Sequence, residues 1–428
     1  MIGPVKLAEL DGKSRAEICE RNKGFTADAE VAVRTILTDV RRRGLAAVLE
    51  YERRFDCPTL KSIKVSSDEI QTAQGQLAKA LRSVIIKAAK RIEAFQRLQL
   101  PREFRRTTKE GELGQKVVPL ERAGVYAPGG TARYPSSVLM GCIPARVAGV
   151  KEIVLCTPPD SNGNVSAEVL FAAKVAGATE VCKIGGAQAI AAMAYGVDGL
   201  NRVGKIVGPG NKYVTSAKAL VRNDCSIDFL AGPSEILVVA DGTAKADLVA
   251  LELVAQLEHD TDAQAILVTT SGGLANDVAT ILPGMANSMP RAETILRAMD
   301  RGCAIIVAGS MDEALEFANE YAPEHLILTI VDSDKALKKV RNAGSIFLGS
   351  ESAVAFGDYC AGPDHILPTM GNARTAGALS PCDFVKLVPY QRFTVEGAMT
   401  LAPIAAAMAR AEGLEAHARS AESRGDER

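Results

Sequence analysis

The chain has 428 residues, with 50 Lys and Arg against 51 Asp and Glu, a formal net charge of −1, and 47% hydrophobic residues. This balance leaves no positive field to hold a phosphate backbone, which argues against nucleic acid as a partner. The length predicts two or three domains of about 150 residues, with ample apolar content for packed cores. The start lacks a basic region followed by an apolar core, and no stretch reaches the roughly 18 apolar residues of a membrane span, so we expect a cytoplasmic protein.

The nine cysteines are odd in number and never form a C-x-x-C pair. This distribution is typical of reduced, buried thiols and not of a disulfide framework or a sulfur metal site. We therefore expect the cysteines to be structural.

The chain changes character near residue 100. Before that point, residues 29–55 and 77–98 carry apolar side chains at three- and four-residue spacing among many charges, which predicts amphipathic helices. After Pro119, short β-branched runs alternate with longer helical patterns. The expected strands cover residues 152–156, 180–184, 236–240, 265–269, 304–308, 326–330 and 345–348, and the expected helices cover 167–176, 187–195, 244–258 and 312–321.

This alternation predicts an α/β fold with two doubly wound, Rossmann-like units, each built on a parallel sheet. Small helical extensions are expected at both ends of the chain. The tail over residues 401–424 is rich in Ala and Glu, with a break at Gly413. It lacks the apolar surface to be stable alone, so we expect it to dock elsewhere.

The dinucleotide fingerprint is incomplete, because no G-x-G-x-x-G and no Walker sequence is present. Three glycine-rich turns instead stand where strands should end: 128–130 (PGG), 185–188 (GGAQ) and 208–211 (GPGN). Their backbone N–H groups are suited to an anion such as pyrophosphate. The alternative is that these glycines only turn the chain.

Only four histidines occur, all in the C-terminal half: His259, His325, His365 and His417. Scarce histidine points to function, since imidazole binds metals and titrates near neutral pH. Gln256 and His259 are three residues apart at the end of an expected helix, so both can reach a common ion. His259 can instead complement the helix dipole, and a solvated surface histidine is the alternative for His417.

Asp358 taken alone is explained better as a turn former than as a ligand. Imidazole together with oxygen donors would suit Zn²⁺, Mn²⁺ or Co²⁺.

Glu324 and His325 are adjacent titratable groups at the start of the strand expected over residues 326–330. Such a pair suits general acid–base catalysis, one group taking an alcohol proton and the other activating water. The alternative is a polar strand entry. Asp364 precedes His365, and a carboxylate there would favour the charged imidazolium.

Ten segments in order resemble the motifs of the histidinol dehydrogenase family and span almost the whole chain. They are 122–130 (RAGVYAPGG), 134–137 (YPSS), 185–188 (GGAQ), 208–211 (GPGN), 231–235 (AGPSE), 256–259 (QLEH), 322–325 (APEH), 357–359 (GDY), 365–369 (HILPT) and 412–417 (EGLEAH). The resemblance implies a homodimer that uses zinc and NAD to oxidise L-histidinol to L-histidine through histidinal, in two hydride transfers. That reaction is the last step of histidine biosynthesis.

Carried over by position, the resemblance assigns one zinc per site to Gln256, His259, Asp358 and His417. It makes Glu324 and His325 the catalytic pair. The substrate contacts would be Ser234, Gln256, His259, His325, Asp358, His365, Glu412 and His417, and the NAD contacts Tyr126, Gln188 and Asn211. In similar proteins the C-terminal segment crosses to the partner protomer, so Glu412 and His417 would complete the neighbour's site.

With the resemblance, the expected domains are an extension over residues 1–22 and a metal and catalytic unit over 23–122 and 235–378. An NAD-side unit follows over 123–234, with a C-terminal extension over 379–428. Asp364 stands where relatives commonly have Asn, and if ionised it would add a negative charge near the site.

Two other functions remain open. A related zinc- and NAD-dependent dehydrogenase would act on another small alcohol, such as a sulfonated diol. A zinc hydrolase would also use a metal and a nearby Glu, but it would not need Tyr126, Gln188 and Asn211 at glycine turns.

Overall fold

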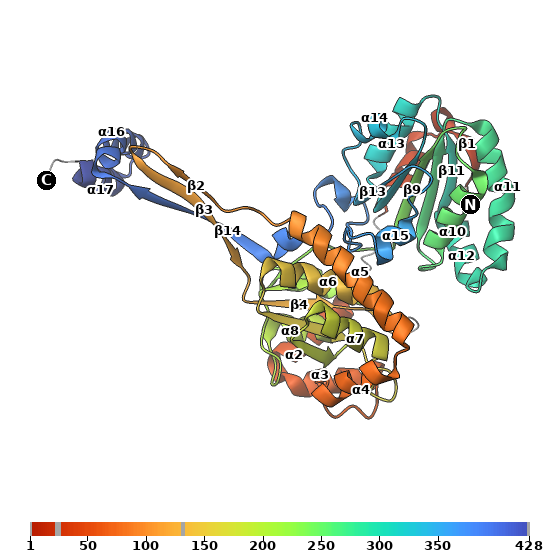
Figure 1. Ribbon diagram of the computed structural model, residues 1–428, viewed down its shortest axis with the longest axis horizontal. Helices are drawn as coiled ribbons and strands as arrows, with labels where there is room; N and C mark the ends of the chain where they lie inside the picture. The colour runs from red at the N-terminus through yellow and green to blue at the C-terminus, as the bar shows by residue number, and fades with distance from the viewer. Residues whose placement is uncertain (1, 22–26, 130–132, 426–428) are drawn as a thin grey trace.

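The computed structural model describes residues 2–21, 27–129 and 133–425. It contains two α/β bodies, each built on a parallel sheet, and a long arm that leads away from both (Figure 1). The predicted fold class of two doubly wound units is confirmed. Within the described ranges, no helix combines the length and the apolar character needed to cross a bilayer.

The smaller sheet has five parallel strands in the order β6-β5-β4-β7-β8. The strands are β4 (Arg122–Tyr126), β5 (Glu152–Thr157), β6 (Glu180–Lys183), β7 (Lys205–Val207) and β8 (Ser226–Ile227). The helices that connect them are α6 (Pro135–Ala148), α7 (Ala167–Ala176), α8 (Gly186–Tyr195) and α9 (Lys212–Val221). Strands β4 and β5 are almost wholly buried, because helices cover both faces of the sheet.

Four N-terminal helices complete this smaller body: α2 (Ala27–Arg43), α3 (Leu45–Phe55), α4 (Ser67–Gln76) and α5 (Lys79–Leu98). Val33 and Val40 share a core with Ile190 of α8, and Ile92 shares one with Ile143 of α6. This packing corrects the expected grouping of residues 23–122 with 235–378. Amphipathic spacing shows that a helix has a buried face but not which sheet that face covers.

The larger sheet has six parallel strands in the order β1-β11-β10-β9-β12-β13. The strands are β1 (Ile2–Lys6), β9 (Glu235–Ala240), β10 (Gln264–Thr269), β11 (Cys303–Val307), β12 (His325–Thr329) and β13 (Ser345–Leu348). Its helices are α10 (Ala246–Leu257), α11 (Gly272–Ser288), α12 (Ala292–Gly302), α13 (Met311–Tyr321), α14 (Ser333–Leu337) and α15 (Val354–Tyr359). The expected extension over residues 1–22 is part of this body, because β1 pairs with β11 and α1 (Gly12–Cys19) packs on α13.

Both sheets share one topology. Apart from β1 at the edge of the larger sheet, the first strand of each unit, β4 or β9, is central; the next two strands lie on one side of it and the last two on the other. The chain order therefore reverses between β4 and β7 and between β9 and β12. In open α/β sheets, ligands bind outside the carboxyl ends of the strands at such a reversal.

The arm consists of β2 (Phe104–Thr107), β3 (Gly111–Pro119) and β14 (Val385–Phe393), joined in an antiparallel sheet. It ends in α16 (Val395–Ala411) and α17 (Glu415–Gly425), which pack on each other through Ala406, Ala409 and Ala418. The predicted break at Gly413 is confirmed, with φ +77°. Figure 1 places these two helices at the far end of the arm, remote from both bodies.

Candidate active site

The candidate catalytic residues gather where the strands of the six-stranded sheet begin, which is called its amino edge; the opposite side, where the strands end, is its carboxyl edge. Ser234 directly precedes β9, His325 is the first residue of β12, and His259 lies in the turn before β10. Helix α10 starts after β9 and runs back across the sheet, so Gln256 in its last turn reaches the same edge. The sequence predicted this strand entry, because polar Glu324 and His325 come directly before an apolar run.

Glu324 and His325 form a buried pair held by one neighbouring residue. Glu324 Oε2 accepts a hydrogen bond of 2.7 Å from the Glu235 backbone N–H, and His325 Nδ1 lies 3.1 Å from the Glu235 carbonyl oxygen. Nδ1 is also 3.6 Å from Glu324 Oε2. A proton on Nδ1 donated to the carbonyl leaves the lone pair on Nε2, which lies 3.5 Å from Asp358 Oδ1.

The surroundings move the pKa values of both groups toward alkaline pH. Burial raises the pKa of Glu324 to about 8, although the neighbouring His325 opposes the shift. Burial alone would lower the pKa of His325, but Glu324 and Asp358 outweigh it and raise that pKa to about 9. Both groups can therefore exchange protons at mildly alkaline pH, as acid–base catalysis requires.

Asp358 is the centre of the candidate metal site. It lies inside α15, and its carboxylate faces His325, so the interpretation as a turn former is wrong. Burial works to raise the pKa of Asp358, but His325, His365 and His259 around it lower the pKa overall. His365 is held in place by a 2.7 Å contact between its Nδ1 and the Asp358 carbonyl oxygen.

Gln256 supplies an amide to the same region. Its side chain is 2% exposed, and its Nε2 has no hydrogen-bond partner in the described structure. Burial lowers the pKa of His259, which keeps the imidazole neutral and able to donate a lone pair. An amide, a neutral imidazole and an ionised carboxylate form a donor set that fits zinc.

The two candidate residues of the tail are separate from this cluster. Glu412 and His417 are exposed, at the end of α16 and in α17, at the far end of the arm. Among the described residues, no three side chains of His, Cys, Asp or Glu lie close enough together to hold a metal ion. Within one chain, therefore, the structure brings Gln256, His259 and Asp358 to one edge without His417.

The candidate cofactor residues lie at the carboxyl edge of the five-stranded sheet. Tyr126 is the last residue of β4, Asn211 caps α9 just after β7, and Gln188 lies in the first turn of α8 after β6. Tyr126 and Asn211 thus flank the β4/β7 reversal. Gly208 has φ +117°, and a Cβ on it would lie 2.1 Å from the Tyr126 carbonyl oxygen, so this turn requires glycine. Gly130 of the first glycine turn lies outside the described residues.

A buried carboxylate that the sequence did not reveal occupies the second glycine turn. Glu52 Oε1 accepts hydrogen bonds of 2.8 Å from Gly185 N–H and from Gln188 Nε2. Burial raises the pKa of Glu52 to about 8, and Asp56 beside it adds to the rise while the bond from Gln188 opposes it. This end of α8 is filled by a carboxyl group of the chain, and Glu52 gave no signal because it only continues an amphipathic helix.

The amino edge of the six-stranded sheet lies close to the smaller body. The loop after α15 accepts a 2.7 Å hydrogen bond at the Cys360 carbonyl from Arg91 Nε of α5. Tyr359, next to Asp358, has a pKa raised by burial, by Asp358 and by Tyr134, which precedes α6. The segment next to Asp358 therefore contacts the smaller body.

Asp364 is buried, and burial opposes the negative charge that it would carry if ionised. It is 3% exposed, its Oδ1 accepts a 2.8 Å hydrogen bond from Ile366 N–H, and its Oδ2 has no partner in the described structure. Burial raises its pKa well above the usual range. Burial lowers the pKa of His365, and the nearby Asp358 opposes this shift without reversing it.

Two parallel sheets, one of which carries a buried pair of titratable residues, Glu324 and His325, define an α/β protein, and comparison with known proteins identifies its family. Residues 19–425 match the family model described as histidinol dehydrogenase, and the chain belongs to this family of oxidoreductases. The histidinol dehydrogenase of Methanosarcina mazei is 44% identical over 421 residues, which cover 98% of this chain and 97% of that protein. The one from Natronomonas pharaonis is 46% identical over 421 residues, covering 98% and 99%.

A solved structure shows the same likeness in three dimensions. The crystal structure of histidinol dehydrogenase from Elizabethkingia anophelis superposes with a TM-score of 0.94 at 36% identity. The superposition covers 99% of this chain and 98% of that one. The likeness therefore includes the arm as well as both α/β bodies.

Proposed function

We propose that this protein oxidises L-histidinol to L-histidine through histidinal, with zinc and two NAD⁺ per substrate. The observation that supports this most directly is the buried Glu324–His325 pair beside Asp358, in a chain of the histidinol dehydrogenase family. Overall, the alcohol carbon loses four electrons as two hydrides, and one water supplies the second oxygen of the carboxylate.

His325 is the base in this proposal. Its Nδ1 bond to the Glu235 carbonyl fixes the ring and leaves Nε2 as the acceptor on the side of Asp358. Nε2 takes the hydroxyl proton as the C–H bond of the same carbon breaks. Burial lowers the pKa of His325, but Glu324 and Asp358 outweigh burial and raise this pKa to about 9, so the basic form gains population as the pH rises toward 9.

Glu324 activates water for the second oxidation. Its pKa of about 8 lets the carboxylate accept a proton from the water that adds to the aldehyde. The hydrated aldehyde again carries a hydroxyl group, and His325 takes its proton in the second oxidation. Glu235 N–H holds Glu324 in place throughout.

Zinc would be held by Gln256, His259 and Asp358 of one chain with His417 of a second copy, and Tyr126, Gln188 and Asn211 would contact NAD. Ser234, His365 and the second copy's Glu412 would contact histidinol. When bound, zinc supplies a Lewis acid that orients the amine and imidazole of the substrate, and NAD⁺ accepts the hydride.

The arm supports the homodimer in this proposal. It exposes apolar side chains along its sheet and helices, among them Leu387 at 51%, Val395 at 74%, Ile404 at 61% and Met408 at 60% exposure. An apolar surface of this kind marks an interaction site. A second copy would cover it and bring His417 and Glu412 to the neighbour's amino edge.

The test is stoichiometric. The purified protein is mixed with limiting L-histidinol and excess NAD⁺ at mildly alkaline pH, and NADH is counted per histidinol consumed. We expect two NADH per histidinol, with activity lost on chelation and restored by zinc. Turnover of a sulfonated diol without turnover of histidinol would move the assignment to a related dehydrogenase. No NADH with zinc bound would contradict the dehydrogenase proposal and favour a hydrolase.

A further inference from the structure

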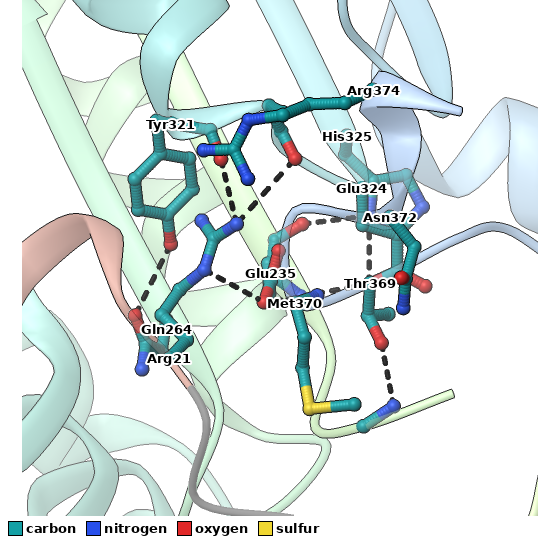
Figure 2. A network of polar contacts seen from close by, with 12 residues as sticks. Arg21, Glu235, Gln264, Tyr321, Glu324, His325, Thr369, Met370, Asn372 and Arg374 are labelled. Atoms are coloured by element: carbon teal, nitrogen blue, oxygen red, sulfur yellow. Dashed lines mark hydrogen bonds and ion pairs between the residues drawn. The ribbon is translucent and has the colours of Figure 1, made fainter. Parts of the chain in front are cut away.

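A buried ion pair lies directly behind the catalytic pair and has no part in the proposed chemistry. Arg21, from the segment after α1, places its Nε 3.2 Å from Glu235 Oε1, and both side chains are 2% exposed. The Arg21 guanidinium stacks 3.6 Å from the centre of the Tyr321 ring, and Tyr321 Oη donates a 3.2 Å hydrogen bond to Gln264 (Figure 2). These contacts tie the N-terminal segment to the strands that carry the site.

The backbone of Glu235 holds both members of the catalytic pair. Its N–H donates to Glu324 Oε2 at 2.7 Å, and its carbonyl oxygen lies 3.1 Å from His325 Nδ1. A displacement of Glu235 would therefore move the general base and the water-activating carboxylate together. The side chain of Glu235 points away from them, toward Arg21 and Met370 (Figure 2).

The same ion pair contacts two turns in which a residue other than glycine has positive φ. Ala322 and Met370 are the two residues other than glycine with positive φ in the described ranges, at +51° and +55°. Arg21 Nη2 donates to the carbonyl oxygens of Tyr321 at 2.6 Å and Ala322 at 3.5 Å. Glu235 Oε1 accepts a 2.9 Å hydrogen bond from Met370 N–H.

Each of the two turns adjoins a segment that carries candidate site residues. Ala322 ends α13 and leads through Pro323 into Glu324 and His325. Met370 ends the segment that begins at His365, and the preceding Thr369 Oγ1 accepts a 2.5 Å bond from Gly232 N–H. Left-handed residues other than glycine persist only where their surroundings fix them, and they cluster at active sites.

We propose that Arg21 and Glu235 are positioning residues, which set the orientation of Glu324 and His325 by fixing the Glu235 backbone and both left-handed turns. This proposal rests on the proposed function, because it assigns the pair a role in that reaction. A buried ion pair is not required for stability, since well-packed apolar residues can do as well, so its presence here favours a role in specifying geometry.

The test uses Arg21→Met and Arg21→Lys in the full-length protein loaded with zinc. Met keeps much of the length of Arg21 without the charge, so we expect kcat to fall about ten- to hundredfold, since small displacements of reacting groups have effects of that size. The KM values for histidinol and NAD⁺ and the bound zinc should change little. Lys restores the charge opposite Glu235 and should recover part of kcat.

The matched control is Arg15→Met. Arg15 also joins an N-terminal segment to α13, through an ion pair with Glu320 and a guanidinium 5.7 Å from the centre of the Phe317 ring, but it contacts neither turn. We expect this variant to keep the wild-type kcat. If Arg21→Met does not fold, Glu235→Gln decides, because it keeps an acceptor for Met370 N–H and loses only the charge, and its kcat should also fall.

The outcomes separate the two proposals. A wild-type protein that yields no NADH from histidinol contradicts the proposed function itself. An active wild type whose Arg21→Met and Glu235→Gln variants lose thermal stability but keep kcat overturns only the positioning role. Loss of kcat that Arg21→Lys partly restores supports it.

Discussion

The two parallel sheets follow one strand order but place their candidate functional residues at opposite edges. In the five-stranded sheet, Tyr126 and Asn211 flank the chain reversal at the carboxyl ends of β4 and β7. In the six-stranded sheet, Glu324 and His325 stand at the amino end of β12. The candidate residues thus stand at the usual ligand position of such a fold in one sheet and not in the other.

A reason for this difference is found at the carboxyl edge of the six-stranded sheet, which carries none of the candidate residues. At the carboxyl ends of β9 and β12, Asp241 Oδ2 accepts a 2.9 Å hydrogen bond from Val331 N–H, and its Oδ1 accepts one of 2.9 Å from Thr243 N–H. The bond from Val331 ties the two strand ends together, and the bond from Thr243 closes the turn after β9. At the amino edge, the turns at Ala322 and Met370 instead bring loops together around the acid–base pair. The comparison shows that equal topology does not fix at which edge the candidate residues gather.

The largest predicted effect is the difference in kcat between a variant at the amino edge and a variant at the carboxyl edge of the six-stranded sheet. His325→Asn keeps an N–H near the Glu235 carbonyl but removes the base, so kcat should fall by about 10²–10⁴-fold. Asp241→Asn removes an acceptor for Val331 N–H at the other edge, so it should lower stability by about 1–2 kcal/mol and leave kcat unchanged. Steady-state kinetics and thermal melts of both variants would measure this. A large loss of kcat in Asp241→Asn would contradict the assignment of the chemistry to the amino edge.

A smaller effect is predicted at the five-stranded sheet. Asn211 Oδ1 caps α9 by accepting from Tyr213 and Val214 N–H, and Asp can replace it as a cap. Asn211→Asp should therefore keep the melting temperature, while its added negative charge raises the KM for NAD⁺ by about tenfold, or 1.4 kcal/mol. Asn211→Ala should instead lose the cap and lower the melting temperature. An unchanged KM for NAD⁺ in Asn211→Asp would place the cofactor elsewhere.

The smallest effect concerns Asp364 at the seam between the two bodies. Because its pKa is raised in the folded state, its contribution to stability is present below about pH 4, the unfolded value, and is lost as the pH rises toward the folded value. Asp364→Asn removes this dependence. We expect the variant to be more stable than wild type at pH 8, with the difference vanishing near pH 4.

Denaturant unfolding at both pH values would measure the effect of Asp364→Asn. A variant less stable than wild type at pH 8 would show that Asp364 is ionised and stabilised by a partner.

Local patterns in the sequence predicted five of the six strands of the larger sheet and two of the five strands of the smaller one. The strand over residues 345–348 and the helix over 167–176 were predicted with the observed bounds, and other elements within one or two residues, because apolar periodicity records burial. The single helical pattern over 29–55 is two helices, since Gly44 between them has φ +59°. The pairing of β3 with β14 was not predicted, because it joins segments about 270 residues apart and β14 is largely exposed.

The candidate site was also predicted only in part, because contacts between distant segments leave no local pattern in the sequence. Scarce histidines and the spacing of Gln256 and His259 pointed to functional side chains. Buried charges such as Glu52, Arg21 and Glu235 have no periodicity that sets them apart from exposed ones, so only packing shows that they contact functional residues. The separation of His417 from His259 also required the structure, since sequence does not show in which direction the arm points.

The most direct test of the account is complementation between two inactive variants. His325→Ala and His417→Ala homodimers should each be inactive toward histidinol and NAD⁺. After subunit exchange, half of the dimers are mixed and each holds one intact site, so about a quarter of the wild-type activity should return. Recovery to that level would show that one chain's catalytic pair works with the other chain's tail. An active His417→Ala homodimer, or a mixture that stays inactive although the subunits have exchanged, would contradict a site shared between two copies.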